Sequence, residues 1–83
     1  MAIKLKPIGQ NMTILTIGNT ELFFSYETLV GYHNGKAYIT DKKWSVTTSR
    51  HITKWLSRHG ITKRDANVIR QSELDEISVS LSS

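Results

Sequence analysis

Residues 42–70 read KKWSVTTSRHITKWLSRHGITKRDANVIR, and the fold depends on what this stretch forms. Within it, the spacing of apolar residues changes from the period of two that is typical of strands to the period of 3.6 that is typical of helices. One face of the expected helix carries Ile52, Trp55, Leu56 and His59. The stretch therefore predicts a main helix at about 48–59 that packs on a sheet.

The signals that start and end a helix agree with this interpretation. Three hydroxyl residues can cap the first turn, because their side chains accept hydrogen bonds from free backbone N–H groups: Thr47, Thr48 and Ser49. Gly60 can end the helix in a left-handed conformation. That ending would bring Ile61 against Leu56.

The same stretch is strongly basic, whereas the rest of the chain is not. It holds eight Lys or Arg against one Asp, a net charge of +7, compared with zero for residues 1–41 and −3 for residues 71–83. The outer helix face and the residues just after it supply five candidates for an anion-binding site: Arg50, Lys54, Arg58, Lys63 and Arg64. A basic block of this kind indicates an anionic partner, although a charged face also serves solubility.

Residues 1–46 alternate apolar and polar residues in short runs separated by turn residues, as in a β-meander. The predicted strands are 3–6, 12–17, 20–26, 28–32 and 36–40, followed by an extended piece at 43–46. Apolar side chains would lie on both faces of this sheet. One face would therefore meet a helix and the other a partner or a second layer.

Two dipeptides predict the hairpin turns of this meander, because tight hairpin turns need residues that tolerate positive φ. Gly18-Asn19 would pair Leu15 with Leu22 and Ile14 with Phe23. Asn34-Gly35, the stronger signal, would pair His33 with Lys36, Tyr32 with Ala37 and Val30 with Ile39.

The region after the main helix contains a second capping pattern. Thr62-x-x-Asp65 predicts a short helix with Ala66 and Ile69 facing inward. Residues 72–83 fit both a helix and a strand, because their apolar residues have helical spacing but also alternate with serines. This last segment would cross back over the sheet or extend its edge.

These elements together predict an α+β fold. It is an antiparallel meander of four to five strands, packed by one main helix at about 48–59, with a short C-terminal helix. The chain is expected to be one domain, 1–83, with the meander at 1–46, a helical segment at 47–71 and a short tail at 72–83.

Two segments form a recognisable pattern: FSYET at 24–28 and KKWSVTTSRHITKWL at 42–56, with YIT at 38–40 between them. In this pattern the chain resembles a family of small uncharacterised proteins of tailed bacteriophages. The resemblance extends over residues 3–57 and fades beyond residue 60. It implies a phage origin and a role in the cytoplasm of the infected host cell, and it implies no particular activity.

Catalysis is not expected. His51 and His59 would lie two helical turns apart, about 12 Å at 1.5 Å per residue, so they cannot share a metal ion. The chain has no HExxH motif, no glycine-rich phosphate loop, no nucleophile elbow and no cysteine. Ser, His and Asp are present, but spacing alone cannot establish a triad. We therefore expect a non-enzymatic protein with no catalytic residues, no metal site and no cofactor.

Two kinds of partner fit this composition. Association with nucleic acid or a nucleoprotein would use phosphate contacts from the basic face, with Trp44, Tyr32 or Tyr38 stacking on bases if exposed. The alternative is a phage-encoded inhibitor or adaptor that binds a host protein. Trp44 and Trp55 are expected chiefly as core residues. No membrane partner is expected, and a homodimer through the second sheet face is a further option.

Overall fold

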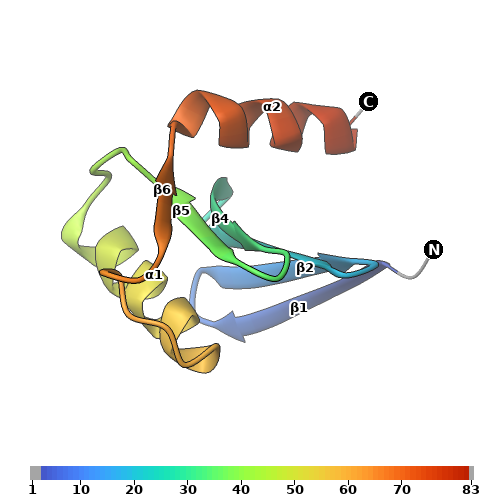
Figure 1. Ribbon diagram of the computed structural model, residues 1–83. Helices are drawn as coiled ribbons and strands as arrows, with labels where there is room; N and C mark the ends of the chain where they lie inside the picture. Colours follow the sequence, from blue (N-terminus) through green and yellow to red (C-terminus); the bar gives the residue numbers. More distant parts are fainter. Residues whose placement is uncertain (1–2, 83) are drawn as a thin grey trace.

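The computed structural model describes residues 3–82 as a six-stranded sheet with a helix on each side (Figure 1). The strands lie in the order β1 (Ile3–Gly9), β2 (Met12–Ile17), β3 (Thr20–Ser25), β4 (Thr28–His33), β5 (Ala37–Thr40) and β6 (Asn67–Ile69). The helices are α1 (Val46–Arg58) and α2 (Gln71–Ser82). The predicted α+β class is confirmed, with one strand more than expected. Residues 1, 2 and 83 of the predicted domain lie outside the described range.

The β2–β3 hairpin has the predicted register. Leu15 pairs with Leu22 and Ile14 with Phe23, across a turn in which Gly18 has a φ of 59°. Successive side chains of a strand point to opposite faces of the sheet. Ile14 and Phe23 therefore face α1, whereas Leu15 and Leu22 face α2.

The predicted register of the β4–β5 hairpin is wrong by one residue. His33 pairs with Ala37 and Gly31 with Ile39, so the loop has three residues. Gly35 has a φ of 77° but Asn34 has no positive φ, and a two-residue type I′ turn needs both. A one-residue shift moves side chains to the opposite face. The observed register places Ala37 and Ile39 under α1, whereas the predicted one put Ala37 on the face of Tyr32.

The main helix starts earlier than predicted and ends as predicted. Its N-cap is Ser45, whose Oγ accepts a hydrogen bond from the Thr48 N–H at 3.1 Å, so none of the three expected cap residues has that role. At the other end Gly60 has a φ of 69°, and the Ile61 N–H donates to the Leu56 carbonyl at 3.0 Å. This is the Schellman ending, in which a left-handed residue lets the chain satisfy the last free carbonyl groups.

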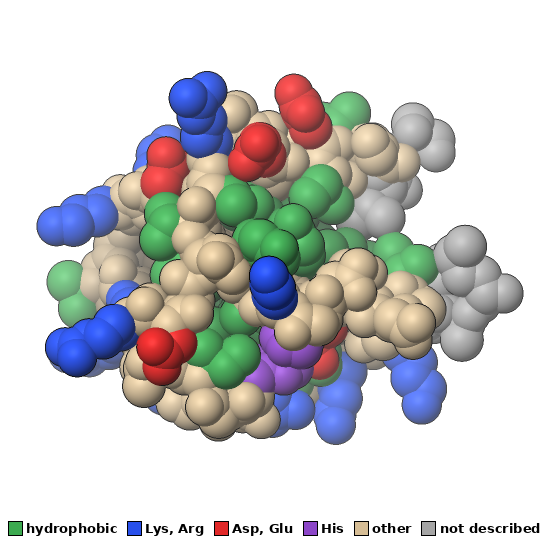
Figure 2. All heavy atoms as spheres, viewed as in Figure 1, with side chains coloured by type: hydrophobic (Ala, Val, Ile, Leu, Met, Phe, Trp, Pro, Cys, Tyr) green, Lys and Arg blue, Asp and Glu red, His purple; other side chains and the backbone are tan. Residues whose placement is uncertain are grey.

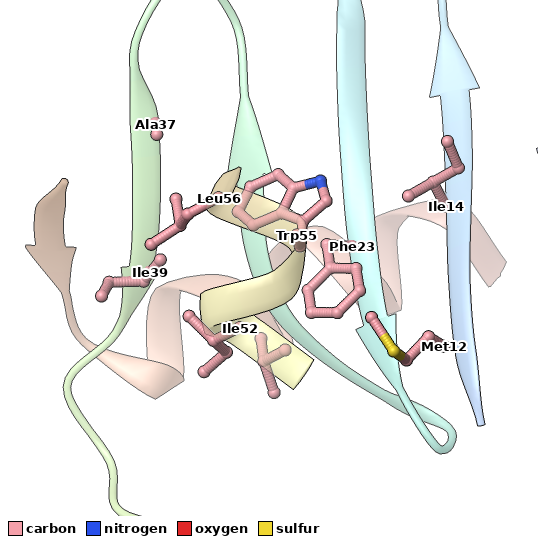
Figure 3. Packing of buried hydrophobic residues seen from close by; sticks show 9 residues of the cluster. Met12, Ile14, Phe23, Ala37, Ile39, Ile52, Trp55 and Leu56 are labelled. Carbon is pink, nitrogen blue, oxygen red and sulfur yellow. The ribbon is translucent and has the colours of Figure 1, made fainter. Parts of the chain in front are cut away.

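The first core lies between α1 and the sheet (Figure 3). Trp55 is fully buried and stacks on Phe23, with ring centroids 5.0 Å apart and planes 3° apart. Beneath its ring lies Gly31, where an added Cβ would come within 2.8 Å of Trp55 Cζ3. The buried residues of this core are Met12, Ile14, Phe23, Val30, Ala37, Ile39, Ile52, Trp55 and Leu56. The expectation that Trp55 is a core residue is therefore confirmed.

The second helix predicted from Thr62 does not form. The Thr62 hydroxyl donates to the Asp65 carboxylate at 3.1 Å, and the Asp65 N–H donates to the Thr62 carbonyl, so the capping pattern closes a single turn. The chain then forms β6, which pairs in parallel with β5 through Ile39 and Val68. β5, α1 and β6 thus form a βαβ unit at the edge of the meander. The C-terminal helix begins only after β6.

α2 covers the second face of the sheet, which the sequence left open to a partner or a second layer. Leu74 is fully buried and packs with Leu22 and Leu29 in a second core. The α2 N-terminus is attached to the end of β5, because the Gln71 N–H donates to Asp41 Oδ1 at 3.0 Å. Of the two courses expected for the last segment, crossing back over the sheet is the one observed, as α2, whereas the sheet edge is extended by the preceding residues 67–69 (Figure 1).

Candidate nucleic-acid interface

The five predicted site residues all have exposed side chains. Arg50, Lys54 and Arg58 lie on the outer face of α1, because the opposite face packs on the sheet. Lys63 and Arg64 lie in the turn that follows α1. The sequence of α1 contains no Asp or Glu, so no acidic side chain of the helix offsets these charges.

Four of these five residues line two separate surface grooves. Arg50 and Lys63 come together with Lys43 and Trp44 in one of them, the Trp44 groove. Lys54 and Arg58 line a different one, the His51 groove. Arg64 lines neither groove. The basic surface thus has two parts, and both include residues of α1.

Trp44 is the functional candidate that the sequence assigned to the core. Its side chain is 41% exposed, although large aromatic side chains usually contribute burial. Its orientation is nevertheless fixed, because Nε1 donates to Gln71 Oε1 at 3.3 Å. Gln71 is itself buried, and its Nε2 donates to the Leu29 carbonyl and to Asp75 Oδ1. An exposed ring is thus held by a buried polar network.

The surroundings of Trp44 are cationic and hydroxylated. Lys42 Nζ lies 4.0 Å from the centroid of the ring, which is a cation–π contact. The groove beside the ring is lined by Lys43, Ser45, Val46, Ser49, Arg50, Thr53 and Lys63. None of these described residues is acidic. Cations and hydroxyl groups can bind phosphate oxygens, and an indole ring can stack on a base.

The sequence signal for Trp44 is its position. It follows two lysines and immediately precedes the helix N-cap, so it lies in the short extended piece predicted at 43–46, between the last predicted strand and the helical stripe. A large aromatic in such a connecting piece is less clearly assigned to a core than one on the helical stripe. This signal could have separated Trp44 from Trp55, which lies on the apolar stripe.

The His51 groove contains a buried histidine held by hydroxyl groups. His51 Nδ1 lies 2.8 Å from the Oγ of buried Ser25, which also hydrogen-bonds to Thr48 Oγ1. Burial, and then the nearby charge of Lys54, lower the pKa of His51. His51 is also among the residues that line the groove. This arrangement presents a neutral imidazole beside Lys54 and Arg58.

The backbone at the rim of the His51 groove is unusual. Asn11 and Tyr26 have φ values of 61° and 57°, in the left-handed region that residues other than glycine rarely adopt. The Tyr26 N–H donates to the Asn11 carbonyl at 2.7 Å, which connects these two positions. The Tyr26 ring, 51% exposed, contacts His51 with ring centroids 5.7 Å apart.

The other two histidines belong to a structural cluster. Glu21 Oε2 accepts a hydrogen bond from Trp55 Nε1 and lies 2.7 Å from His59 Nε2, while His33 stacks on His59 with centroids 4.3 Å apart. Burial would raise the pKa of Glu21, but the hydrogen bonds from His59 and Trp55, with the charges of His59 and Arg58, lower it. Within residues 3–82 no group of His, Asp and Glu is arranged to hold a metal ion.

Tyr32 and Tyr38, considered as base-stacking residues, lie on the opposite side of the sheet. They pair across β4 and β5 and stack on each other, with centroids 4.7 Å apart. Burial, and then the neighbouring Tyr38 and Glu73, raise the pKa of Tyr32. Two half-buried rings that face each other beside a carboxylate do not form an anion-binding surface.

Comparison with known proteins identifies a family but no characterised relative. The model of a family of unknown function (DUF8033) matches residues 3–76. No curated protein and no solved structure matches the chain. No helix in the described part of the chain is long and apolar enough to cross a membrane.

Proposed function

Because the chain belongs to the family of unknown function DUF8033, its function has to be inferred from its surface, and we propose that it binds nucleic acid or a nucleoprotein. The basic residues on and around α1 would contact the phosphates. The protein would act without catalysis, as a small accessory protein of a bacteriophage in the host cytoplasm. The phage origin is part of the proposal, and its support is the FSYET and KKWSVTTSRHITKWL pattern.

The observation that carries the proposal is the separation of charge across the sheet. One side carries α1, whose charged residues are Arg50, Lys54 and Arg58. The other side carries α2, whose charged residues are Glu73, Asp75 and Glu76. Figure 2 shows acidic side chains over α2, at the top of the view. The electrostatic field of a protein that is basic on the α1 side and acidic on the α2 side would orient the α1 side toward a polyanion.

A second candidate function rests on one apolar residue. Val46, in the Trp44 groove, is 69% exposed, and an exposed Val beside an exposed Trp would suit contact with a protein partner. An inhibitor or adaptor that binds an acidic host protein would use the same basic surface for electrostatic complementarity. The absence of binding to DNA and RNA would favour this alternative.

A salt titration with matched variants tests the nucleic-acid proposal. The variant Lys54→Glu with Arg58→Glu should weaken binding to DNA or RNA, and the dependence of log K on log salt should become shallower by about one for each lost phosphate contact. The control Lys4→Glu with Lys6→Glu changes two exposed lysines of β1 and lowers the net charge equally.

This control shows whether the affinity depends on the α1 surface or only on the net charge of the protein. If both double variants weaken binding to the same extent, net charge alone explains the affinity and the α1 surface is not the site. If the wild-type protein binds neither polymer at low salt, the proposed function is wrong. Fluorescence anisotropy between about 50 and 200 mM salt would measure these affinities.

A further inference from the structure

We propose that the Trp44 groove binds an unpaired base by stacking on the indole ring, so that the protein prefers single-stranded to double-stranded nucleic acid. This inference rests on the proposed function and names its substrate class. It assigns to Trp44 a role that the five basic residues cannot perform, because phosphate contacts occur on single strands and duplexes alike.

The first argument is that the ring is exposed and yet held in place. A surface tryptophan that could rotate freely would lose side-chain entropy on stacking, which weakens binding. Here the Nε1–Gln71 hydrogen bond fixes the edge of the ring. Gln71 cannot follow the ring outward, because its own amide is bound to the Leu29 carbonyl inside the protein. The indole is therefore preorganised as a flat platform.

The second argument is that the platform lies among cations. Lys42 lies over the ring, and Lys43, Arg50 and Lys63 line the groove beside it. An exposed lysine can move from the ring to a neighbouring phosphate when a base takes its place. Sites for single strands combine these two elements, a positively charged groove that follows the backbone and aromatic rings on which bases stack.

The third argument concerns duplexes. In a double helix both faces of each base are covered by neighbouring base pairs, so an aromatic ring reaches a base face only at an end or after unstacking. Helix α1 does not offer another means of reading a duplex. One face of α1 packs on the sheet, and its outer face carries Arg50, Lys54 and Arg58, which suit phosphates rather than base edges and are separated by Thr53 and Ser57.

The test compares two substitutions of Trp44 that differ in whether an aromatic ring remains. Trp44→Phe and Trp44→Leu both remove the hydrogen bond to Gln71, but only Phe can still stack on a base. For a single-stranded oligothymidylate, Trp44→Leu should lose about tenfold or more in affinity, and Trp44→Phe should lose clearly less, because its ring can still stack although no hydrogen bond orients it. For a duplex of the same length, the two variants should bind equally. Matching thermal unfolding curves establish that both are folded.

A second measurement uses the intrinsic fluorescence of the wild-type protein, with Trp44→Phe as its control. Trp44 is exposed and Trp55 is fully buried, so iodide should quench mainly the fluorescence of Trp44. Binding of oligothymidylate should quench or shield this component, and the change should be absent in Trp44→Phe. A duplex of the same length should produce much less change.

The outcomes distinguish the inference from the function on which it rests. If the wild-type protein binds single strands and duplexes equally, or if Phe and Leu at position 44 are equivalent for single strands, stacking is wrong. The proposed function still stands in that case, provided that Lys54→Glu with Arg58→Glu weakens binding. If neither polymer binds, both proposals are overturned.

Discussion

Gly31 is the residue on which the first core depends most directly. The Trp55 ring lies so close to it that an added Cβ would be 2.8 Å from Trp55 Cζ3 and 2.8 Å from the Tyr38 carbonyl oxygen. Neither neighbour can easily move, since one is a fully buried indole and the other is backbone. Gly31→Ala should therefore destabilise the protein by about 2 kcal/mol through overpacking, which lowers the melting temperature by about 10 °C.

The matched control for this substitution is Gly9→Ala. A Cβ at Gly9 would meet Met12 Sδ at 3.2 Å, and a flexible methionine side chain can give way. This variant should melt within a few degrees of the wild type, about 4 °C at most. Equal melting temperatures for the two variants, measured by circular dichroism, would show that the Trp55 contact does not exclude a methyl group.

His51 gives the protein a predictable dependence on pH. Its pKa is lowered from 6.5 by burial and then by Lys54, while Ser25, Thr48 and Tyr26 surround the ring with neutral groups. Below pH 6.5, His51 is therefore protonated to a greater extent in the unfolded chain than in the folded protein. The stability associated with this group is complete above pH 6.5 and is lost as the pH falls below that value.

The variant His51→Asn tests this dependence, because an Asn amide can keep the hydrogen bond to Ser25 but does not titrate. The wild type should lose more stability than the variant between about pH 7 and pH 5.5 in urea unfolding. The carboxylate of Glu21, whose pKa is lowered from 4.5, contributes stability that is lost only at more acidic pH. If the stability of the two proteins fell in parallel with pH, the loss of stability would not be due to His51.

At the scale of elements, the N-cap of α1 makes a sharp prediction. The Ser45 Oγ accepts the Thr48 N–H, whereas Thr47 is exposed and lies inside the first turn. Ser45→Ala should cost about 1 kcal/mol, the usual value of a lost N-cap. Thr47→Ala should change stability by no more than about 0.5 kcal/mol. If chemical unfolding showed a larger loss of stability for Thr47→Ala than for Ser45→Ala, Thr47 and not Ser45 would be the N-cap.

The elements that could be predicted are those specified by nearby residues. Gly60 and Ile61 ended α1 as expected, and Gly18 fixed the β2–β3 register, because local backbone geometry determines both. The β4–β5 register failed because Asn34 tolerates positive φ without requiring it. β6 was missed because only its pairing with β5, which is distant in sequence, makes residues 67–69 a strand.

The candidate interface was predictable to a similar degree. Helical periodicity placed Arg50, Lys54 and Arg58 on the outer face of α1, and their side chains are exposed. Periodicity could not predict the position of Trp44, whose ring is oriented by a hydrogen bond to Gln71, 27 residues away. It also could not show that Arg50 and Lys63 share a groove, because the turn at 62–65 brings them together only in the folded chain.

At the scale of the whole molecule, the single sheet carries a core on each face, and the two cores use adjacent residues. Leu22 and Leu29 belong to the α2 core, while Phe23 and Val30 belong to the α1 core. Their backbones are the same two strands, β3 and β4. Loss of packing on one face therefore weakens the support of the other. A small domain of this kind should unfold in one cooperative transition.

The substitution Leu74→Ala tests whether the two cores unfold together, because it weakens the α2 core and leaves the α1 core unchanged. Leu74 is a fully buried apolar residue of α2, so its truncation should cost about 3 kcal/mol, a large share of the 5–15 kcal/mol typical of a domain. Val79→Ala, on the same helix but 66% exposed, should cost less than about 0.5 kcal/mol. The fluorescence of Trp55, in the opposite core, should then change at the same lowered temperature as the helical signal. An earlier loss of helix, with Trp55 still buried, would mean that α2 detaches alone and that the two cores are independent.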